Sequence, residues 1–439
     1  MSIRLRHMLR LSPSAKEING LKPDDDVTFA PMEAIGDGLG GLDASGTKPL
    51  IEVQSGSYNY FSDGDVLLAK VTPCFENGKK ALASGLTNGV GFATSEVHVL
   101  RPDPSKLDER FLFYLLSSED FRAEGMKSMT GAGGLKRISD GAVLNYRPQI
   151  TNLAQQKKIA AFLDRETVRI DGLISKKEQF VDSQYRRMLS KLQVLVLGGA
   201  SVQRGLEGEW LHDLPYGWRL IPLKHLVSVM GGATPSKDRD DFWNGDIPWV
   251  SPKDMKYDII SDVPDHVSEL ALQNSAIQLV PKHAVLIVVR GMILARKVPI
   301  CRLGLPATIN QDMKALLPHV NIIRADYLQR MLQGFEDVLM SFIEEAAHGT
   351  KKLRSDSLFT LKFPVPPINI QATIVQEYEK EWEKSEKVIK ATMASIDRLR
   401  EYRAALITAA VAGEIDADAC GKTGATSATL DRIEEEMQA

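Results

Sequence analysis

Two glycine-containing loops, each followed at once by cations, are the clearest functional signals in this sequence, and they favour contact with an anionic partner. One loop spans Gly131–Arg137 and the other spans Gly349–Arg354. Glycine lets the backbone approach a ligand closely, and Lys and Arg side chains contact phosphate oxygens. The two loops therefore predict two anionic contact sites. The cations expected to make these contacts are Lys136, Arg137, Lys351, Lys352 and Arg354.

Three further segments carry side chains that reach phosphates and base edges. Lys70–Lys80 begins at the end of an expected strand in the first half, and Gly231–Lys237 lies early in the second half. Arg290 ends the expected strand of the second half that corresponds to the one in the first half. Cationic, hydroxyl and amide groups are the ones that contact nucleic acids. For Lys70–Lys80 alone, a solvated surface turn is an equally good interpretation. The candidate contact residues here are Lys70, Thr72, Asn77, Lys79, Lys80, Thr234, Ser236, Lys237 and Arg290.

Sequence signatures of catalysis and of metal binding are missing. Gly36–Gly41 satisfies the dinucleotide-binding pattern, but it lies in a polar loop with no strand before it and no helix after it. Pro366-Pro367 lacks the sequence context of an amino-methyltransferase motif. Cys74, Cys301 and Cys420 are far apart, and the eight histidines show no metal-ligand spacing. The sequence therefore offers no reason to predict an enzyme.

Composition restricts the class of protein further. The chain has 439 residues, with 54 Lys and Arg against 57 Asp and Glu, so nucleic-acid binding requires local basic patches rather than a global positive charge. This length is typical of two to four domains. Apolar runs such as Ala284–Val289 are far shorter than the ~20 residues of a membrane helix. Because Met1–Arg6 lacks the apolar core of a signal peptide, we expect a cytoplasmic protein without membrane contact.

The chain repeats itself. A shift of 216 residues places residues 100–155 on residues 316–371 without a gap, and ten positions are then identical. The identities cluster in loops and at helix starts, which favours a duplication over coincidence. The matched positions are Leu100 and Leu316, Pro102 and Pro318, Leu112 and Leu328, Leu116 and Leu332, Gly133 and Gly349, Lys136 and Lys352, Ser139 and Ser355, Asp140 and Asp356, Pro148 and Pro364, and Gln155 and Gln371.

A long helix is expected to end each copy. Neither Gly nor Pro interrupts the second one between Gln371 and Ala412, and each helix of about 40 residues would be ~60 Å long. Two independent surface helices are the alternative, but such a length exceeds the width of one domain, so antiparallel packing is predicted. The apolar seams are Leu163, Ile170, Leu173 and Phe180 in the first copy, and Val375, Tyr378, Trp382, Ser385, Ile389, Thr392, Ile396, Leu399, Arg403, Leu406 and Ala410 in the second.

The remainder of each copy is predicted to be mixed α/β. Runs rich in β-branched residues predict strands, and longer periodic segments predict helices before the repeated loops. Trp243 and Trp249 are expected to be core or platform residues rather than base readers. The expected strands are Val66–Val71, Val97–Arg101 and Ala284–Arg290, and the expected helices are Asp108–Met129 and Arg324–Ala347.

Taken together, these segments resemble the specificity subunit of type I restriction-modification systems, over residues 25–415. The residues that carry the resemblance in the first half are Asp65–Pro73, Asn77–Lys79, Gly131–Ile138, Gln155–Asp164 and Ile170-Asp171. In the second half they are Gly232–Ser236, Trp243–Ser251, Gly349-Thr350, Pro364–Pro367, Gln371 and Arg403–Gly413. One departure is Tyr146–Ile150, which stands where the family has a Pro-Pro pair.

The resemblance implies a non-catalytic protein with two tandem target-recognition domains, each reading one half of a split site on double-stranded DNA. Two long antiparallel coiled-coil helices would set the spacing of the half-sites and dock two methyltransferase (M) subunits, through which restriction (R) subunits join. AdoMet, ATP and Mg²⁺ are expected on partner subunits, with no cofactor on this chain. Two alternatives are a degenerate nuclease or methyltransferase that acts alone, and a coiled-coil scaffold without DNA readout.

The expected fold is therefore an α/β (α+β) pair of recognition domains with a pseudo-twofold internal repeat. The predicted segments are residues 1–154 for the first recognition domain, 155–197 for the first spacer helix, 198–212 for a linker, 213–370 for the second recognition domain, 371–412 for the second spacer helix and 413–439 for a mobile tail with a short helix at Leu430–Met437.

Overall fold

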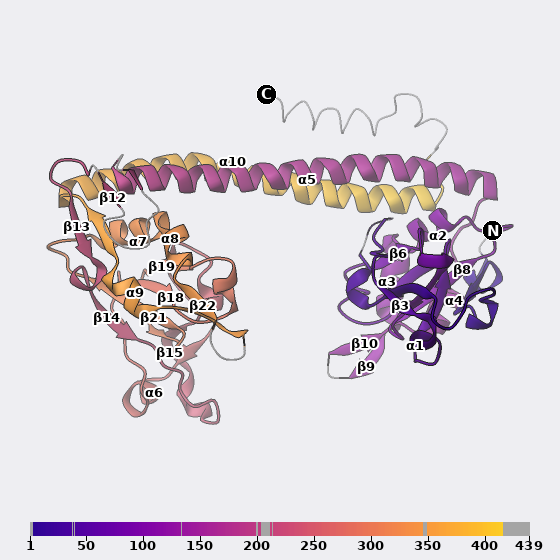
Figure 1. Ribbon diagram of the computed structural model, residues 1–439, viewed down its shortest axis with the longest axis horizontal. Coiled ribbons are helices and arrows are strands. Elements are labelled where there is room, and N and C mark those ends of the chain that lie inside the picture. The colour runs from indigo at the N-terminus through magenta and orange to yellow at the C-terminus, as the bar shows by residue number, and fades with distance from the viewer. Residues whose placement is uncertain are drawn as a thin grey trace. The chain divides into compact units, whose positions relative to one another are not determined.

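The computed structural model describes residues 3–36, 38, 40–132, 134–198, 201–202, 211–212, 214–345 and 349–415. The chain divides into two compact units (Figure 1). Unit 1 consists of Met1–Gln179 and Thr392–Ala439, and unit 2 consists of Phe180–Ala391. Each unit therefore contains a segment of both long helices. The predicted short helix in the tail lies outside the described residues.

Unit 1 is built on two four-stranded sheets. The strand Val66–Ala69 (β5) is buried along its whole length, as expected for a central strand without polar alternation. The first sheet has the order β1 (Leu9–Leu11), β8 (Val97–Pro102), β5 and β6 (Lys80–Leu82), all antiparallel. The second has the order β3 (Thr47–Pro49), β2 (Asp26–Ala30), β7 (Val90–Ala93) and β4 (Asn59–Ser62), with β2 and β7 parallel.

Short helices cover the first sheet of unit 1. The single helix predicted over Asp108–Met129 is two helices, because the Ser118 side chain accepts a hydrogen bond from the Phe121 N–H and starts a new one. They are α2 (Glu109–Leu115) and α3 (Glu119–Ser128), followed by α4 (Asp140–Asn145). The other helices described in this unit are α1 (Leu50–Gln54) and the 3₁₀ helices η1 (Leu5–His7), η2 (Ala15–Glu17), η3 (Met32–Ala34) and η4 (Thr87–Gly89).

Unit 2 repeats the first sheet in extended form. Its five-stranded sheet has the order β14 (Val227–Gly231), β21 (Met313–Pro318), β18 (Val285–Val288), β19 (Ile300–Leu303) and β16 (Ile259–Ile260), of which only β16 and β19 pair in parallel. A three-stranded sheet has the order β17 (His266–Val267), β15 (Trp243–Val250) and β20 (Thr308–Ile309). A two-stranded antiparallel sheet pairs β13 (Arg219–Pro222) with β24 (Lys362–Val365).

The helix predicted over Arg324–Ala347 is also interrupted. It forms α7 (Ala325–Gly334) and α8 (Glu336–Met340), after which Ile343–Glu345 is a strand, β22, paired with β23 (Lys351–Leu353). A Cβ atom on Gly334 would lie 2.8 Å from the Val196 side chain, so this glycine allows close packing where α7 ends. The other elements of unit 2 are α6 (Glu269–Asn274), α9 (Ser355–Thr360), η5 (Leu223–His225), η6 (Asp240–Phe242), η7 (Pro252–Asp254) and η8 (Met292–Ala295).

The two long helices are α5 (Leu153–Leu197) and α10 (Ile368–Val411), close to the predicted bounds. Between them, Ser201-Val202 (β11) pairs with Leu211-His212 (β12), so the predicted linker contains a short pair of strands. No helix in the described part of the chain combines the length and apolar character needed to cross a membrane.

Within unit 1, the helix segments run antiparallel. Arg403 of α10 forms an ion pair with Asp171 of α5 at 2.9 Å, whereas Arg400, which is earlier in α10, pairs with Glu178, which is later in α5, also at 2.9 Å. The predicted seam residues from Leu163 to Leu173 and from Ile396 to Ala410 are buried wherever they are apolar. Phe180 is 41% exposed, so its assignment to the seam was wrong. The buried positions continue through Lys177 and Val181 instead, because steps of four keep them on one face.

Within unit 2, the segments of α5 and α10 also pack together. Met188, Leu192 and Val196 of α5 join the same hydrophobic core as Val375 and Tyr378 of α10. The Lys191 ammonium lies 3.7 Å from the Glu381 carboxylate. The rings of Tyr185 and Trp382 are 5.9 Å apart. The core of each unit thus extends from its main sheet, through α2 in unit 1 or α7 in unit 2, to the long helices.

The repeat is confirmed, but its register changes by one residue partway along. Gln156 accepts a hydrogen bond from the Asp108 N–H and donates to the carbonyls of Lys106 and Thr151, each at 3.0 Å. In unit 2, Gln371 makes the same three bonds, with the Arg324 N–H and the carbonyls of Ile322 and Pro366, at 2.8–2.9 Å.

The counterpart of Gln371 is therefore Gln156 and not Gln155. The gapless alignment holds through α2 and α7 but is one residue out after them. By the same register, Thr151-Asn152, rather than Tyr146–Ile150, stands at the position of Pro366-Pro367.

Candidate nucleic-acid interface

A cationic cleft in unit 2 brings together two of the predicted contact residues. The cleft has a volume of about 330 Å³, and Arg290 and Lys352 line it together with Lys314. Arg290 follows β18 and forms an isolated β-bridge with Lys352 of β23, while Lys314 lies in the neighbouring strand β21. Within the described part of the chain, none of these three cations has a carboxylate at ion-pair distance. Three unneutralised positive charges around one opening favour an anionic ligand.

Sequence reasoning missed Lys314 because it lies inside a strand rather than in a loop. It pairs with Ile287 across β18 and β21, so its position beside Arg290 follows from the order of strands in the sheet. The remaining polar side chains of the cleft are Gln311 and Ser355, and its glycines are Gly231 and Gly232.

Gly232 is required where the wall of the cleft meets β20. A Cβ atom at this position would lie 2.0 Å from the carbonyl oxygen of Asn310, which is a backbone atom and cannot easily move. The loop after Gly232 is held by the two tryptophans, because Trp249 Nε1 donates to the Ala233 carbonyl and Trp243 Nε1 donates to the Ser236 carbonyl, each at 3.0 Å. Trp249 is buried, which confirms its predicted core role.

The other predicted residues of this loop have different surroundings. The Thr234 hydroxyl donates to the Gln311 side chain at the edge of the cleft. Ser236 is exposed, and its hydroxyl accepts from the Asp238 N–H at 3.3 Å. Lys237 is also exposed. Of these three predicted residues, only Thr234 lies at the edge of the cleft.

In the hairpin of β22 and β23, two of the three predicted cations are paired with acidic side chains of the hairpin itself. The Lys351 ammonium lies 2.7 Å from Glu345, which holds the pKa of that carboxyl below its usual value. Arg354 lies 3.9 Å from Glu344. Gly349 has a φ of +76°, a conformation that other residues rarely adopt. Only Lys352 lines the cleft.

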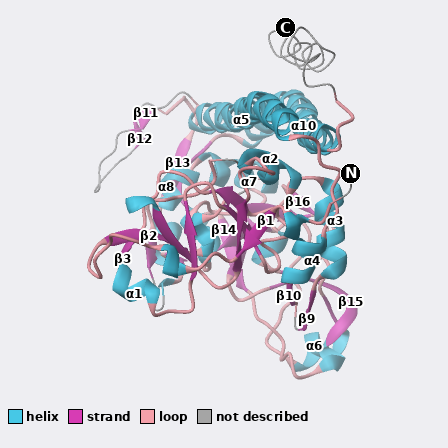
Figure 2. Ribbon diagram, turned by 90° about the vertical axis from the view of Figure 1, so that its right-hand side faces the viewer, coloured by secondary structure: helices cyan, strands magenta, loops and turns pink. Residues whose placement is uncertain are grey.

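In unit 1, the corresponding hairpin joins β9 (Thr130–Ala132) to β10 (Leu135–Arg137) and lies at the end of the unit opposite α5 (Figures 1 and 2). Thr72 anchors it, since its hydroxyl donates to the Gly134 carbonyl at 2.9 Å and accepts from the Lys136 N–H at 3.0 Å. Lys136 is exposed. Arg137 makes a two-point ion pair with Glu96. Gly133 lies outside the described residues.

The segment Lys70–Lys80 is only partly available for contact. Lys80 is 4% exposed, its ammonium donates to the Gly78 carbonyl at 3.2 Å, and it lies 5.1 Å from the centre of the Phe113 ring. This burial in the core removes Lys80 from the candidate contacts. Lys79 donates to the Met32 carbonyl at 3.2 Å, Lys70 is half-buried and Asn77 is exposed.

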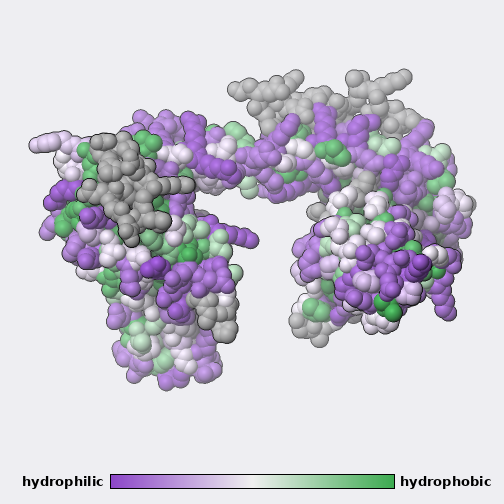
Figure 3. Space-filling model, viewed as in Figure 1, coloured by the Kyte–Doolittle hydropathy of each residue, from purple (hydrophilic) through white to green (hydrophobic). Residues whose placement is uncertain are grey.

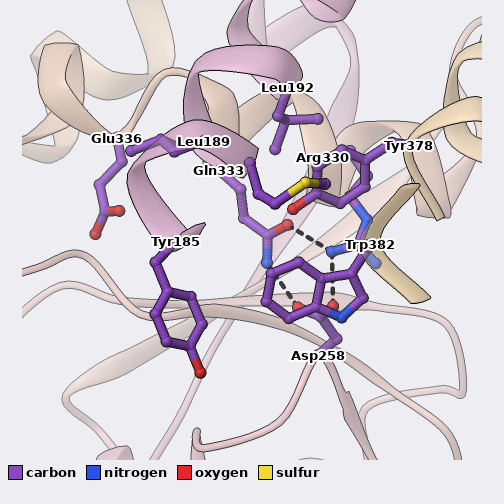
Figure 4. A pocket seen from close by; sticks show the side chains of 10 residues that line it. Tyr185, Leu189, Leu192, Asp258, Arg330, Gln333, Glu336, Tyr378 and Trp382 are labelled. Carbon is purple, nitrogen blue, oxygen red and sulfur yellow. Dashed lines mark hydrogen bonds and ion pairs between the residues drawn. The ribbon is translucent and has the colours of Figure 1, made fainter. Parts of the chain in front are cut away.

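A second cleft in unit 2 has about 260 Å³ and lies where the long helices meet α7 (Figure 4). Arg330 donates to Asp258 at 2.7 Å and to Gln333 at 2.9 Å, and Gln333 donates to Asp258 at 3.0 Å. The guanidinium also lies 4.9 Å from the centre of the Tyr378 ring. These hydrogen bonds join α7 to the segment just before β16, and the ring contact joins α7 to α10. Because Asp258 neutralises Arg330, this cleft is not a second anionic contact site.

No group of three or more His, Cys, Asp or Glu side chains suited to a metal ion occurs among the described residues. Burial, together with the charge of Lys70, lowers the pKa of His98 to about 4, so its ring is neutral at neutral pH. His98 Nε2 lies 3.3 Å from the carbonyl of Ile138, the residue that follows the unit 1 hairpin.

Comparison with known proteins identifies both units. The sequence model described as "Type I restriction modification DNA specificity domain" matches residues 26–179 and again residues 215–384, which is most of the chain. The chain is 39% identical over 151 residues to the type I restriction enzyme EcoR124I/EcoR124II specificity subunit of Escherichia coli. These matched residues are 34% of this chain and 37% of the relative. It is also 36% identical over 140 residues to the type I restriction enzyme EcoEI specificity subunit of the same organism, and these residues are 32% of this chain and 23% of the relative.

The matched region thus spans little more than a third of these relatives at most. The fold is also found in a solved chain from a study described as "Structural basis underlying complex assembly and conformational transition of the type I R-M system". That chain has a TM-score of 0.68 and 19% sequence identity, with 94% of this chain and 98% of the other covered.

Proposed function

Because the chain belongs to the type I restriction modification DNA specificity family, we propose that it is the DNA-recognition subunit of a type I restriction-modification complex. Each unit would read one half of a split site on double-stranded DNA. The observation that carries this proposal is the cleft of unit 2, where Arg290, Lys314 and Lys352 are together without a described carboxylate partner. Cations of this kind contact phosphates, whose neutralisation releases counterions and makes the affinity depend on salt.

Removal of two of these charges provides the test. For the double variant Arg290→Ala with Lys314→Ala, we expect the slope of log affinity against log salt concentration to fall by about two units, one for each lost phosphate contact. Binding of the full chain to duplex DNA is measured at several salt concentrations. The matched control is Lys282→Ala, which removes an exposed cation just before β18, at the end opposite Arg290. Equal slopes for the double variant and the unaltered chain would rule out the cleft as a phosphate site.

We also propose that α5 and α10 set the gap between the half-sites and dock two methyltransferase subunits, through which restriction subunits join. Exposed apolar side chains along both helices support docking, since a partner would cover them. They include Val168, Phe180, Tyr185, Val194, Val388 and Met393. Figure 3 shows these helices as mostly hydrophilic with single apolar residues between, a surface suited to a soluble partner rather than to a bilayer. AdoMet, ATP and Mg²⁺ would then be held by the partner subunits.

The repeat supports the proposed number of methyltransferase subunits. Each unit presents one segment of α5 beside one segment of α10, so we expect two copies of the methyltransferase for each copy of this chain. Co-expression followed by measurement of the mass of the purified complex gives the ratio. The control is the chain expressed alone, which we expect to aggregate. A stable one-to-one complex would contradict the proposed docking.

A further inference from the structure

The Arg137 side chain of unit 1 is bound by a carboxylate, although it is exposed and lies at the end of the hairpin. Arg137 Nη2 donates to one oxygen of Glu96 at 2.7 Å and Nε donates to the other at 2.9 Å. The side chains are 49% and 34% exposed. The hydrogen bonds from Arg137 hold the pKa of Glu96 below its usual value, so Glu96 is ionised at neutral pH. The pair therefore carries no net charge.

The equivalent place in unit 2 is built differently. The Lys70 N–H donates to the Glu96 carbonyl and the Val289 N–H to the Asp312 carbonyl, both at 2.8 Å, so Asp312 is the counterpart of Glu96. Lys352 is the counterpart of Arg137, because each forms the isolated bridge to the strand end beside it. Among the described residues, Lys352 has no ion pair with Asp312. The fold is thus the same in both units, but only unit 1 has a neutralised guanidinium here.

A neutralised guanidinium is poorly suited to phosphate and well suited to a base edge. The attraction of a cation for the DNA backbone is electrostatic, and Glu96 cancels most of it. Arg has five N–H groups, of which Nε and one hydrogen of Nη2 are used on Glu96. The two hydrogens of Nη1 and the second hydrogen of Nη2 remain, and they form the fork that fits O6 and N7 of guanine.

The hairpin also holds this fork in place. β10 is tied to the loop after β5 through the Thr72 hydroxyl and through the bridge between Val71 and Arg137. The two hydrogen bonds that Arg137 donates to Glu96 fix the plane of the guanidinium, so little side-chain entropy is lost when a base binds. His98 contacts the residue after Arg137, since its Nε2 lies 3.3 Å from the Ile138 carbonyl.

We propose that Arg137 and Glu96 form a base-reading pair, in which Arg137 donates to a guanine edge in the half-site of unit 1. Glu96 is the positioning residue, because it orients the guanidinium and suppresses its binding to phosphate. Lys352 and its neighbours in unit 2 contact phosphate instead. This inference rests on the proposed function in DNA recognition.

The test is Glu96→Gln in the full chain co-expressed with its methyltransferase. Binding to duplex DNA of random sequence is measured against salt, and methylated sites are mapped across a bacterial genome. Once Glu96 loses its charge, Arg137 can contact phosphate, so the salt slope should increase by about one unit. The preference at one base pair of one half-site should fall roughly 10- to 100-fold. Arg137→Lys keeps the charge and loses the fork, so it should relax the same position without a change of slope.

The matched control is Asp103→Asn. Asp103 forms an exposed ion pair with Lys106 just after β8, whereas Glu96 lies just before β8, so the same change of charge occurs at the other end of one strand. We expect neither a steeper slope nor a relaxed site for this control. Thermal unfolding of each variant shows whether it is folded, and Arg137→Lys decides the question if Glu96→Gln is not.

Three outcomes would overturn the inference. If Glu96→Gln matches the unaltered chain while that chain reads a split site, the pair is an ordinary surface ion pair. If Asp103→Asn changes binding as much as Glu96→Gln, only the net charge matters. If the unaltered chain with its methyltransferase methylates no defined sequence, the proposed function itself fails and the inference fails with it.

Discussion

Replacing Gln156 by leucine is expected to lower the free energy of unfolding of unit 1 by about 2–4 kcal/mol. Gln156 is fully buried and satisfies one backbone N–H and two backbone carbonyls where the first turn of α5 meets the segment before α2. Leucine fills a similar volume but makes none of these bonds. Each buried backbone group left without a partner costs about 1–3 kcal/mol, and partial access of water to the site reduces the sum.

The adjacent residue provides the control. Gln155 is only partly buried, and we expect Gln155→Leu to change the free energy of unfolding by less than about 0.5 kcal/mol. Gln371→Leu should repeat the large effect in unit 2, where the same three bonds are lost. Unfolding in urea, followed by circular dichroism, measures all three variants. Equal effects for Gln155→Leu and Gln156→Leu would show that the register change in the repeat has been assigned wrongly.

Lengthening the long helices is expected to widen the gap between the two half-sites by one or two base pairs. Four added residues extend a helix by about 6 Å and rotate its C-terminal part by about 40°. A base pair rises ~3.4 Å and turns about 34–36°, so length favours nearly two base pairs and rotation favours one. The insertions belong after Gln179 in α5 and after Ala391 in α10, where one unit ends and the other begins. Mapping of methylated sites measures the gap.

The half-site sequences themselves should stay the same, because the hairpins and the cleft are untouched. The control is an insertion of the same length after Ser55, in the exposed turn after α1, which should leave both the gap and the half-sites unchanged. If the gap is unaltered after both helices are lengthened, or if the base pairs of the half-sites change, the helices do not set the gap between the half-sites.

Much of the architecture was predictable because it depends on local periodicity. The spacing of apolar residues and the lack of Gly and Pro placed α10 within a few residues of its bounds, and β5 and β8 were found from their β-branched and apolar runs. The repeat was visible because the same loops recur. Three predictions were less accurate: the linker, the end of the helix before the second hairpin, and the place of Phe180 in the seam. The end of the helix depends on close packing at Gly334, and the buried face of a long helix depends on the residues that pack against it. In both cases the neighbours are distant in sequence.

The amino-acid sequence alone was sufficient to place cations in two loops and to assign the family. Which of those cations is available was decided by tertiary structure. The packing of α2 on β6 buried Lys80 against Phe113, and the order of the strands brought Lys314 to the cleft beside Arg290. The fold also set Glu96, just before β8, against Arg137 of β10 from 41 residues away. The physical reason is that the availability of a charge depends on its desolvation and on its nearest counter-charge. Both are properties of residues that come together only when the sheets form.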